Sequence, residues 1–187
     1  DGSARWIYPA SLKYPSFLNF YNQSSTRGKL LKLLMKIIFY ANLFLRVLVR
    51  KHSSEVADGS ILAEILSRGD NFNYSIFMGT VGENRKVIVE VNENKNTISF
   101  IKVGVSASAV GLVDNECYIL RQLSERGSVS FEFPKVLSHA RGIVEISNIN
   151  FDGSLQSPRL LPAHLAAVKE LAEMGSSCSK YNELPAS

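Results

Sequence analysis

The sequence predicts an α+β domain, in which a five-stranded antiparallel sheet carries one packed helix and follows an apolar helical region. Three observations support this class. Short segments rich in β-branched and aromatic residues recur between residues 72 and 147, with polar or glycine-containing turns between them. After the third of these segments, apolar residues repeat at the 3.6-residue period of a helix. The segment 28–52 is the most apolar of the chain.

Length and composition indicate a globular protein of one domain, or two small ones. The chain has 187 residues, of which 45% are hydrophobic and 20% charged, and a net charge of +4. This charge is too small to indicate a nucleic-acid partner, and aromatic and basic residues do not interleave on the predicted strands. Cys117 and Cys178 lie far apart, without a Cys or His at metal-ligand spacing, which favours free thiols in a reducing, cytoplasmic compartment.

Residues 1–71 are predicted to form an N-terminal arm and a helical region. Residues 1–27 combine aromatic residues with two prolines, which favours an extended arm whose Trp6 and Tyr8 pack on their own domain. The helix 28–52 is expected to pack against its own or a missing domain, or to lie at an anionic membrane surface. It lacks about twenty uninterrupted apolar residues, which argues against a membrane span. A short helix follows, capped by Asp58 or Ser60.

Residues 72–149 are predicted to hold the sheet and its helix. The helix covers residues 109–124, and the strands cover residues 72–81, 85–91, 97–105, 134–138 and 142–147. Residues 150–187 would contain a connecting hinge, a helix at 161–174 and a polar tail.

Lys102 and Glu116 are the residues on which the functional interpretation depends. Lys102 lies late in the third predicted strand, and Glu116 follows fourteen positions later in the helix. A strand lysine aimed by a helix glutamate can neutralise the phosphates of a nucleotide; the alternative is a surface lysine at a strand edge. Gly79 and Gly82, in the first hairpin, would let the backbone approach phosphates closely, although an ordinary hairpin turn would explain them equally well.

Several segments together resemble the N-terminal lobe of the aminoglycoside phosphotransferase and choline-kinase-like family, the small-molecule branch of the protein-kinase-like fold. They are F-M-G-T-V-G-E-N-R-K-V-I-V-E-V at 77–91, S-F-I-K-V at 99–103, D-N-E-C-Y-I-L-R-Q-L at 114–123, P-K-V-L-S-H at 134–139 and G-I-V-E-I-S-N-I at 142–149. Two upstream segments resemble, more loosely, the N-terminal regions of bacterial members linked to polysaccharide biosynthesis: R-W-I-Y-P at 5–9 and Y-N-Q-S-S-T-R-G-K-L-L-K-L-L at 21–34.

The resemblance implies ATP and Mg²⁺ as cofactors and a small hydroxylated molecule as substrate. It implies that Lys102 contacts the α- and β-phosphates, that Glu116 orients Lys102, and that Gly79 to Gly82 cover the phosphates. Ser147, Asn148 and Ile149 would form the hinge that offers backbone groups to adenine.

The chain departs from this family in its catalytic residues. The family's catalytic loop reads H-G-D with an Asn a few residues later, and none of His52, His139 and His164 has an aspartate in that pattern. The sequence therefore offers no general base and no magnesium ligands. We expect either an N-terminal fragment, whose catalytic lobe lies in a longer chain, or a stand-alone binding lobe.

Two functions follow as expectations. The first is the nucleotide-binding lobe of an ATP-dependent phosphotransferase, without its catalytic lobe. The second is a non-catalytic interaction module in which the helix 28–52 docks a partner or a membrane. A lobe that lacks its companion exposes an apolar surface, so self-association is expected as well.

Overall fold

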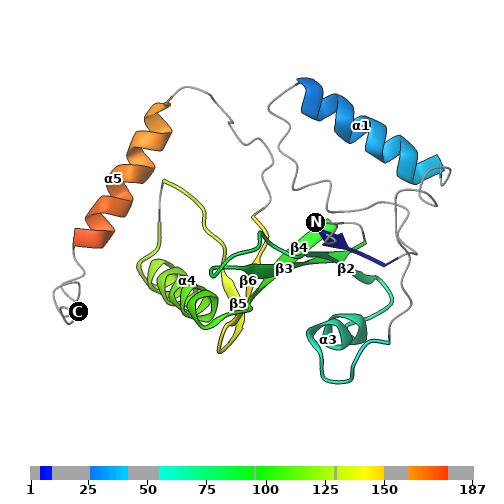
Figure 1. The fold of residues 1–187 in the computed structure, drawn as a ribbon. Coiled ribbons are helices and arrows are strands. Elements are labelled where there is room, and N and C mark those ends of the chain that lie inside the picture. The colour runs from blue at the N-terminus through cyan, green and yellow to red at the C-terminus, as the bar shows by residue number, and fades with distance from the viewer. Residues whose placement is uncertain are drawn as a thin grey trace.

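The fold is α+β, with an antiparallel sheet and helices on both of its faces. The computed structural model describes residues 5–9, 26–41, 55–94, 96–128, 130–149 and 160–176, and this part of the chain holds six strands and four helices. The strands lie in the order β1-β2-β3-β4-β6-β5 (Figure 1). They are β1 (Trp6–Ile7), β2 (Phe72–Phe77), β3 (Lys86–Glu93), β4 (Asn96–Gly104), β5 (Val136–Ala140) and β6 (Ile143–Ser147).

The predicted class and antiparallel pairing are confirmed, whereas the predicted count of five strands is wrong. The additional strand is β1, which pairs antiparallel with β2 at the edge of the sheet. A two-residue strand is too short to show the alternating pattern by which strands are recognised in a sequence. The other five strands fall at the predicted places, with ends shifted by a few residues.

Two of the four described helices begin at a serine cap. They are α1 (Thr26–Ala41), α3 (Ile61–Ser67), α4 (Ala107–Arg126) and α5 (Pro162–Ser176). Ser60, rather than Asp58, caps α3 by accepting a hydrogen bond from the N–H of Ala63 at 3.2 Å, and Ser106 caps α4 in the same way. Within the described part of the chain, no helix is long and apolar enough to cross a membrane. The rest of the predicted helix, residues 42–52, lies outside the described residues.

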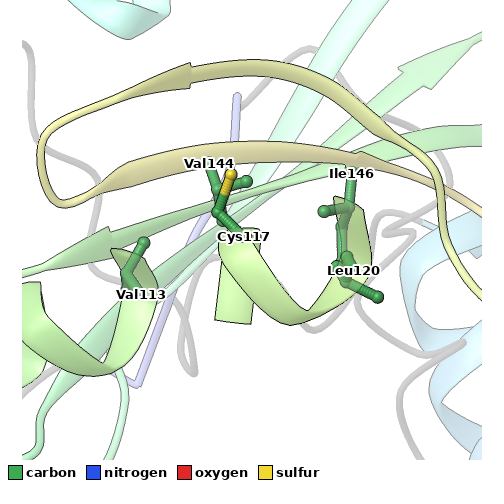
Figure 2. Close-up of a cluster of buried hydrophobic side chains, with 5 residues drawn as sticks. All are labelled: Val113, Cys117, Leu120, Val144 and Ile146. Atoms are coloured by element: carbon green, nitrogen blue, oxygen red, sulfur yellow. The ribbon is translucent and has the colours of Figure 1, made fainter. Parts of the chain in front are cut away.

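Helix α4 covers one face of the sheet. Its side chains Val113, Cys117 and Leu120 pack against Val144 and Ile146 of β6 (Figure 2). The three helix residues are spaced at three and four positions, so they share one side of α4 and are buried together. Cys117 is a free thiol inside this cluster, and Cys178 lies outside the described residues.

Helix α3 covers the opposite face. Ile65 is fully buried there against Val89, Val91 and Ile101. These strand residues alternate with residues that point toward α4, as the period-two geometry of a strand requires. The sheet is therefore the middle layer of a three-layer core.

An ion pair fixes α3 to the sheet. The Arg68 guanidinium, at the end of α3, donates hydrogen bonds of 2.8 and 2.9 Å to the two carboxylate oxygens of Glu145 on β6. The buried Ser99 hydroxyl of β4 donates a third, at 2.6 Å. A buried carboxylate is costly unless it is paired and hydrogen-bonded, and here both conditions are met.

The N-terminal segment packs on its own chain, as predicted for Trp6 and Tyr8. The Trp6 ring lies 4.8 Å from the ring of Phe77 on β2, centroid to centroid. Phe39 of α1 is buried against Trp6, Tyr8 and Met35. Strand β1 therefore connects the sheet with α1.

Replacing Arg68 by Met should lower the free energy of unfolding by about 2 kcal/mol, because it leaves the Glu145 carboxylate buried without its cation. Arg68 keeps a quarter of its side chain exposed, so we expect less than the ~3–5 kcal/mol of a fully buried pair. The measurement is urea unfolding followed by circular dichroism. The matched control is Glu64→Gln, which removes the other partner of Arg68 at an exposed position and should cost about 0.5 kcal/mol or less. Equal losses of unfolding free energy in both variants would contradict the conclusion that Arg68 stabilises the fold through Glu145.

The contribution of this ion pair should disappear in acid. The Arg68 guanidinium holds the pKa of Glu145 below its ordinary value, against the opposing effect of burial, and the Ser99 hydroxyl lowers it further. A lowered pKa in the folded state stabilises the protein above the unfolded-state pKa, about 4.3, and this stabilisation is lost as the pH falls through the folded-state pKa.

The test compares the free energies of unfolding of the unmodified protein and Glu145→Gln as the pH is lowered from neutral. The difference should be largest at neutral pH and should shrink as the pH falls from about 4.3 through the lowered folded-state pKa of Glu145. A difference that stays constant through this range would show that the charge of Glu145 contributes nothing.

Candidate nucleotide site

Lys102 lies on the central strand β4 and points toward the α4 side of the sheet. Its strand neighbours are Ile88 on β3 and Val144 on β6. Val144 belongs to the cluster under α4, whereas Ile101 and Val103 belong to the cluster under α3. Lys102 is therefore on the face covered by α4, the helix that directly follows β4 along the chain.

Glu116 reaches Lys102 from α4. The Lys102 ammonium donates a hydrogen bond to Oε1 of Glu116, and both side chains are about three-quarters buried. Glu116 precedes the buried Cys117, so the packing of that residue sets the height of the carboxylate above the sheet. The structure thus brings together the two residues that the sequence singled out.

Close packing of α4 on the end of β4 contributes to this geometry. A Cβ added at Gly104 would lie 2.5 Å from the backbone nitrogen of Val110, in the first turn of α4. Any side chain at this position would push the helix away from the strand. The glycine therefore lets α4 begin three residues after β4 ends, with Glu116 within reach of Lys102.

Lys86 is a third member of the site, which sequence reasoning missed. Its ammonium lies 3.5 Å from Oε2 of Glu116, so one carboxylate is shared by two lysines. Lys86 begins β3 and pairs with Gly104, two residues beyond Lys102 on the neighbouring strand. Its part in the site follows from the register of the two strands, which the sequence alone does not specify.

Two positive charges on one negative charge make this site a potential anion-binding position. The group carries a formal charge of +1, and Lys86, Lys102 and Glu116 each keep about a quarter of their side chain exposed. An anion that approaches such a partly desolvated group interacts with it more strongly than with a fully hydrated lysine.

Gly79 and Gly82 lie in the loop that joins β2 to β3. Gly79 has a φ of +69°, and a Cβ there would lie 2.2 Å from the carbonyl oxygen of Lys86. The backbone at Gly79 therefore lies close beside the start of β3. Gly82, in contrast, has open space around its Cα.

The same loop is attached to the beginning of α4. The Ser108 hydroxyl donates a hydrogen bond of 2.6 Å to Oδ1 of Asn84, and the Ser106 hydroxyl donates to the carbonyl of Glu83. Arg85 closes the loop from within by donating to the carbonyl of Met78 at 2.8 Å. These bonds place the loop at the end of the sheet where Lys86 and α4 begin.

Ser147 ends β6, and Asn148 and Ile149 follow it; the N–H groups of Ser147 and Asn148 both donate to backbone carbonyls of the neighbouring segments. The Ser147 N–H donates to the carbonyl of Lys135, and the Asn148 N–H donates to the carbonyl of Ile98 at 2.8 Å. The Asn148 side-chain amide also donates to the carbonyl of Thr97 at 2.9 Å. Asn148 thus satisfies two carbonyl groups at the point where the pairing of β3 with β4 shifts register.

A second polar contact joins α4 to the β5–β6 turn. Asp114 Oδ1 accepts a hydrogen bond from the N–H of Gly142 at 2.8 Å and lies 3.0 Å from Nε2 of His139. The Gly142 N–H, with a smaller contribution from His139, lowers the pKa of Asp114 below its ordinary value. His139 therefore has a structural role, through its contact with Asp114, although it belongs to no catalytic motif.

No metal centre is found among the described residues, where no three His, Cys, Asp or Glu side chains gather closely enough to hold an ion. Comparison with protein-family models gives no match to this chain. No curated protein and no solved structure matches it significantly either.

Replacing Gly79 by Ala should lower the free energy of unfolding by about 3 kcal/mol or more, because its Cβ would collide with a backbone carbonyl that no side-chain rotation can move. The matched control is Gly59→Ala. Gly59 has a φ of +73° but nothing within 4 Å of its Cβ position, so only the backbone strain of about 1 kcal/mol is expected. Thermal unfolding of both variants measures the difference. Similar losses would show that the loop relaxes freely around Gly79.

Proposed function

We propose that the sheet and α4 form the nucleotide-binding lobe of an ATP-dependent phosphotransferase that acts on a small hydroxylated molecule. The observation that carries the proposal is the contact between Lys102 on β4 and Glu116 on α4. A phosphate-binding lysine must be held in a fixed orientation, and a partly buried helix carboxylate at hydrogen-bonding distance can hold it there. The order of elements from β2 to β6, with α4 after the third of these strands, agrees with the kinase-like resemblance.

The phosphate part of ATP fits the site well. Lys102 and Lys86 share one carboxylate, so the group retains a positive charge that can interact with the α- and β-phosphates. The β2–β3 loop, which contains Gly79 and Gly82, lies at the Lys86 end of the site. Its backbone would cover phosphates bound there.

The adenine part fits less completely. Ser147 pairs with Ser99, three residues before Lys102, so the predicted hinge lies ~10 Å from Lys102 along β4. This separation suits a base and the first phosphates of one nucleotide. The N–H groups of Ser147 and Asn148 already donate within the sheet, so in this proposal the contacts to adenine fall to Ile149 and to carbonyl groups.

Catalytic residues are not assigned to this chain. ATP would supply the phosphoryl group, and the residues discussed above would bind and orient it. Magnesium is part of the proposal through the kinase-like resemblance alone, and we assign no ligand for it among the described residues.

Titration with a fluorescent N-methylanthraniloyl derivative of ATP tests the proposal. Lys102→Ala should weaken binding by about ten-fold, because it removes a charge-assisted contact to phosphate. Lys86→Ala should weaken binding less, and Glu116→Gln should weaken it by leaving both lysines without an orienting partner. The control is Lys169→Ala, an exposed lysine on α5, which should bind like the unmodified protein. Absence of binding in the unmodified protein, or unchanged binding in Lys102→Ala, would refute the proposal.

A further inference from the structure

Helix α1 presents an apolar surface to solvent. Leu30, Leu33, Leu34 and Ile37 follow the spacing i, i+3, i+4, i+7, which places them on one side of a helix, and they are 50–68% exposed. The opposite side holds Phe39, which is buried against β1. We call the four exposed residues the outer face of α1.

Positive charges flank this outer face, and α1 contains no acidic residue. Lys29 and Lys36 are seven positions apart, so they lie along the same flank, and Arg27 lies on the other. All three side chains are exposed. An apolar face with basic residues beside it is typical of a helix that lies in the interface of a membrane.

Positive charge is also concentrated near α1 in the sequence as a whole. Residues 1–54 contain nine lysines and arginines and one acidic residue, Asp1. Residues 55–187 contain twelve lysines and arginines and sixteen acidic residues. The end of the chain that contains α1 is therefore strongly basic, whereas the part that contains β2 to β6 is slightly acidic.

Helix α5 provides the contrast within the same molecule. It also exposes apolar side chains, among them Leu165 and Val168. Its sequence includes Glu170 and Glu173, however, and only one lysine, Lys169. An exposed apolar stripe is therefore common to both helices, and the basic flanks are specific to α1.

We propose that α1 is an interfacial anchor whose outer face inserts into an anionic phospholipid surface, with the helix axis parallel to the membrane. Such a surface supplies both an apolar layer for Leu30, Leu33, Leu34 and Ile37 and negative charge at the depth of the flanking lysines. The inward side of α1 keeps its contact with β1, so the sheet would be held at the membrane by the packing around Phe39.

Co-sedimentation with lipid vesicles tests this proposal. The protein should sediment with vesicles of equal parts phosphatidylcholine and phosphatidylglycerol, and much less with pure phosphatidylcholine. The double variant Leu30→Gln/Ile37→Gln should reduce the bound fraction by about ten-fold. Lys29→Gln/Lys36→Gln should weaken binding by about five-fold per lysine, and only on the anionic vesicles. The matched control, Leu165→Gln/Val168→Gln on α5, changes two equally exposed apolar residues and should bind like the unmodified protein.

Three outcomes would overturn the proposal. The first is no preference of the unmodified protein for anionic vesicles. The second is equal binding by the Leu30→Gln/Ile37→Gln variant and by its α5 control. The third is sedimentation velocity, without lipid, that shows an oligomer for the unmodified protein and a monomer for Leu30→Gln/Ile37→Gln, because the outer face would then be covered by a second copy. Far-UV circular dichroism verifies that each variant keeps its helices.

Discussion

The buried carboxylate of Glu145 is the constraint on which the arrangement of the layers depends. A negative charge buried on the face of a sheet requires a cation, and Arg68 at the end of α3 supplies it. Helix α3 has only seven residues, too few to be stable by itself, so it depends on this pair, on its Ser60 cap and on the burial of Ile65. Because α3 then covers one face, the other face is left to α4, and Lys102 points to the side where α4 lies.

The candidate site follows from the same division of faces. Alternation along β4 sends Ile101 and Val103 to the α3 side and Lys102 to the α4 side, where Glu116 is within reach. Because Glu116 also contacts Lys86, its carboxylate balances only part of the positive charge around it. A site that is fully neutralised would have little reason to attract phosphate, whereas this one retains a charge in a partly dehydrated position.

Sequence reasoning could find the features that depend on local patterns and not those that depend on register. The strands from β2 to β6 and helix α4 follow from periodicity, and the Lys102–Glu116 pair is singled out by its residue types and their order in the kinase-like pattern. Lys86 reaches Glu116 only because β3 and β4 pair in one particular register. Asn148 donates to the carbonyls of Thr97 and Ile98 only because that register shifts there. Strand β1 was not predicted, because two residues are too few to show an alternating pattern. The aromatic character of Trp6 nevertheless indicated that this segment packs on the domain.

The position of Trp6 makes the intrinsic fluorescence of the protein a probe of one particular region. It is the single tryptophan of the sequence, and its ring lies against Phe77 of β2 and near Phe39 of α1. The intrinsic fluorescence of the protein therefore observes the junction between the sheet and α1 rather than the core under α4. Any event that loosens this junction would change the emission maximum by hydrating the indole, without an added dye or label.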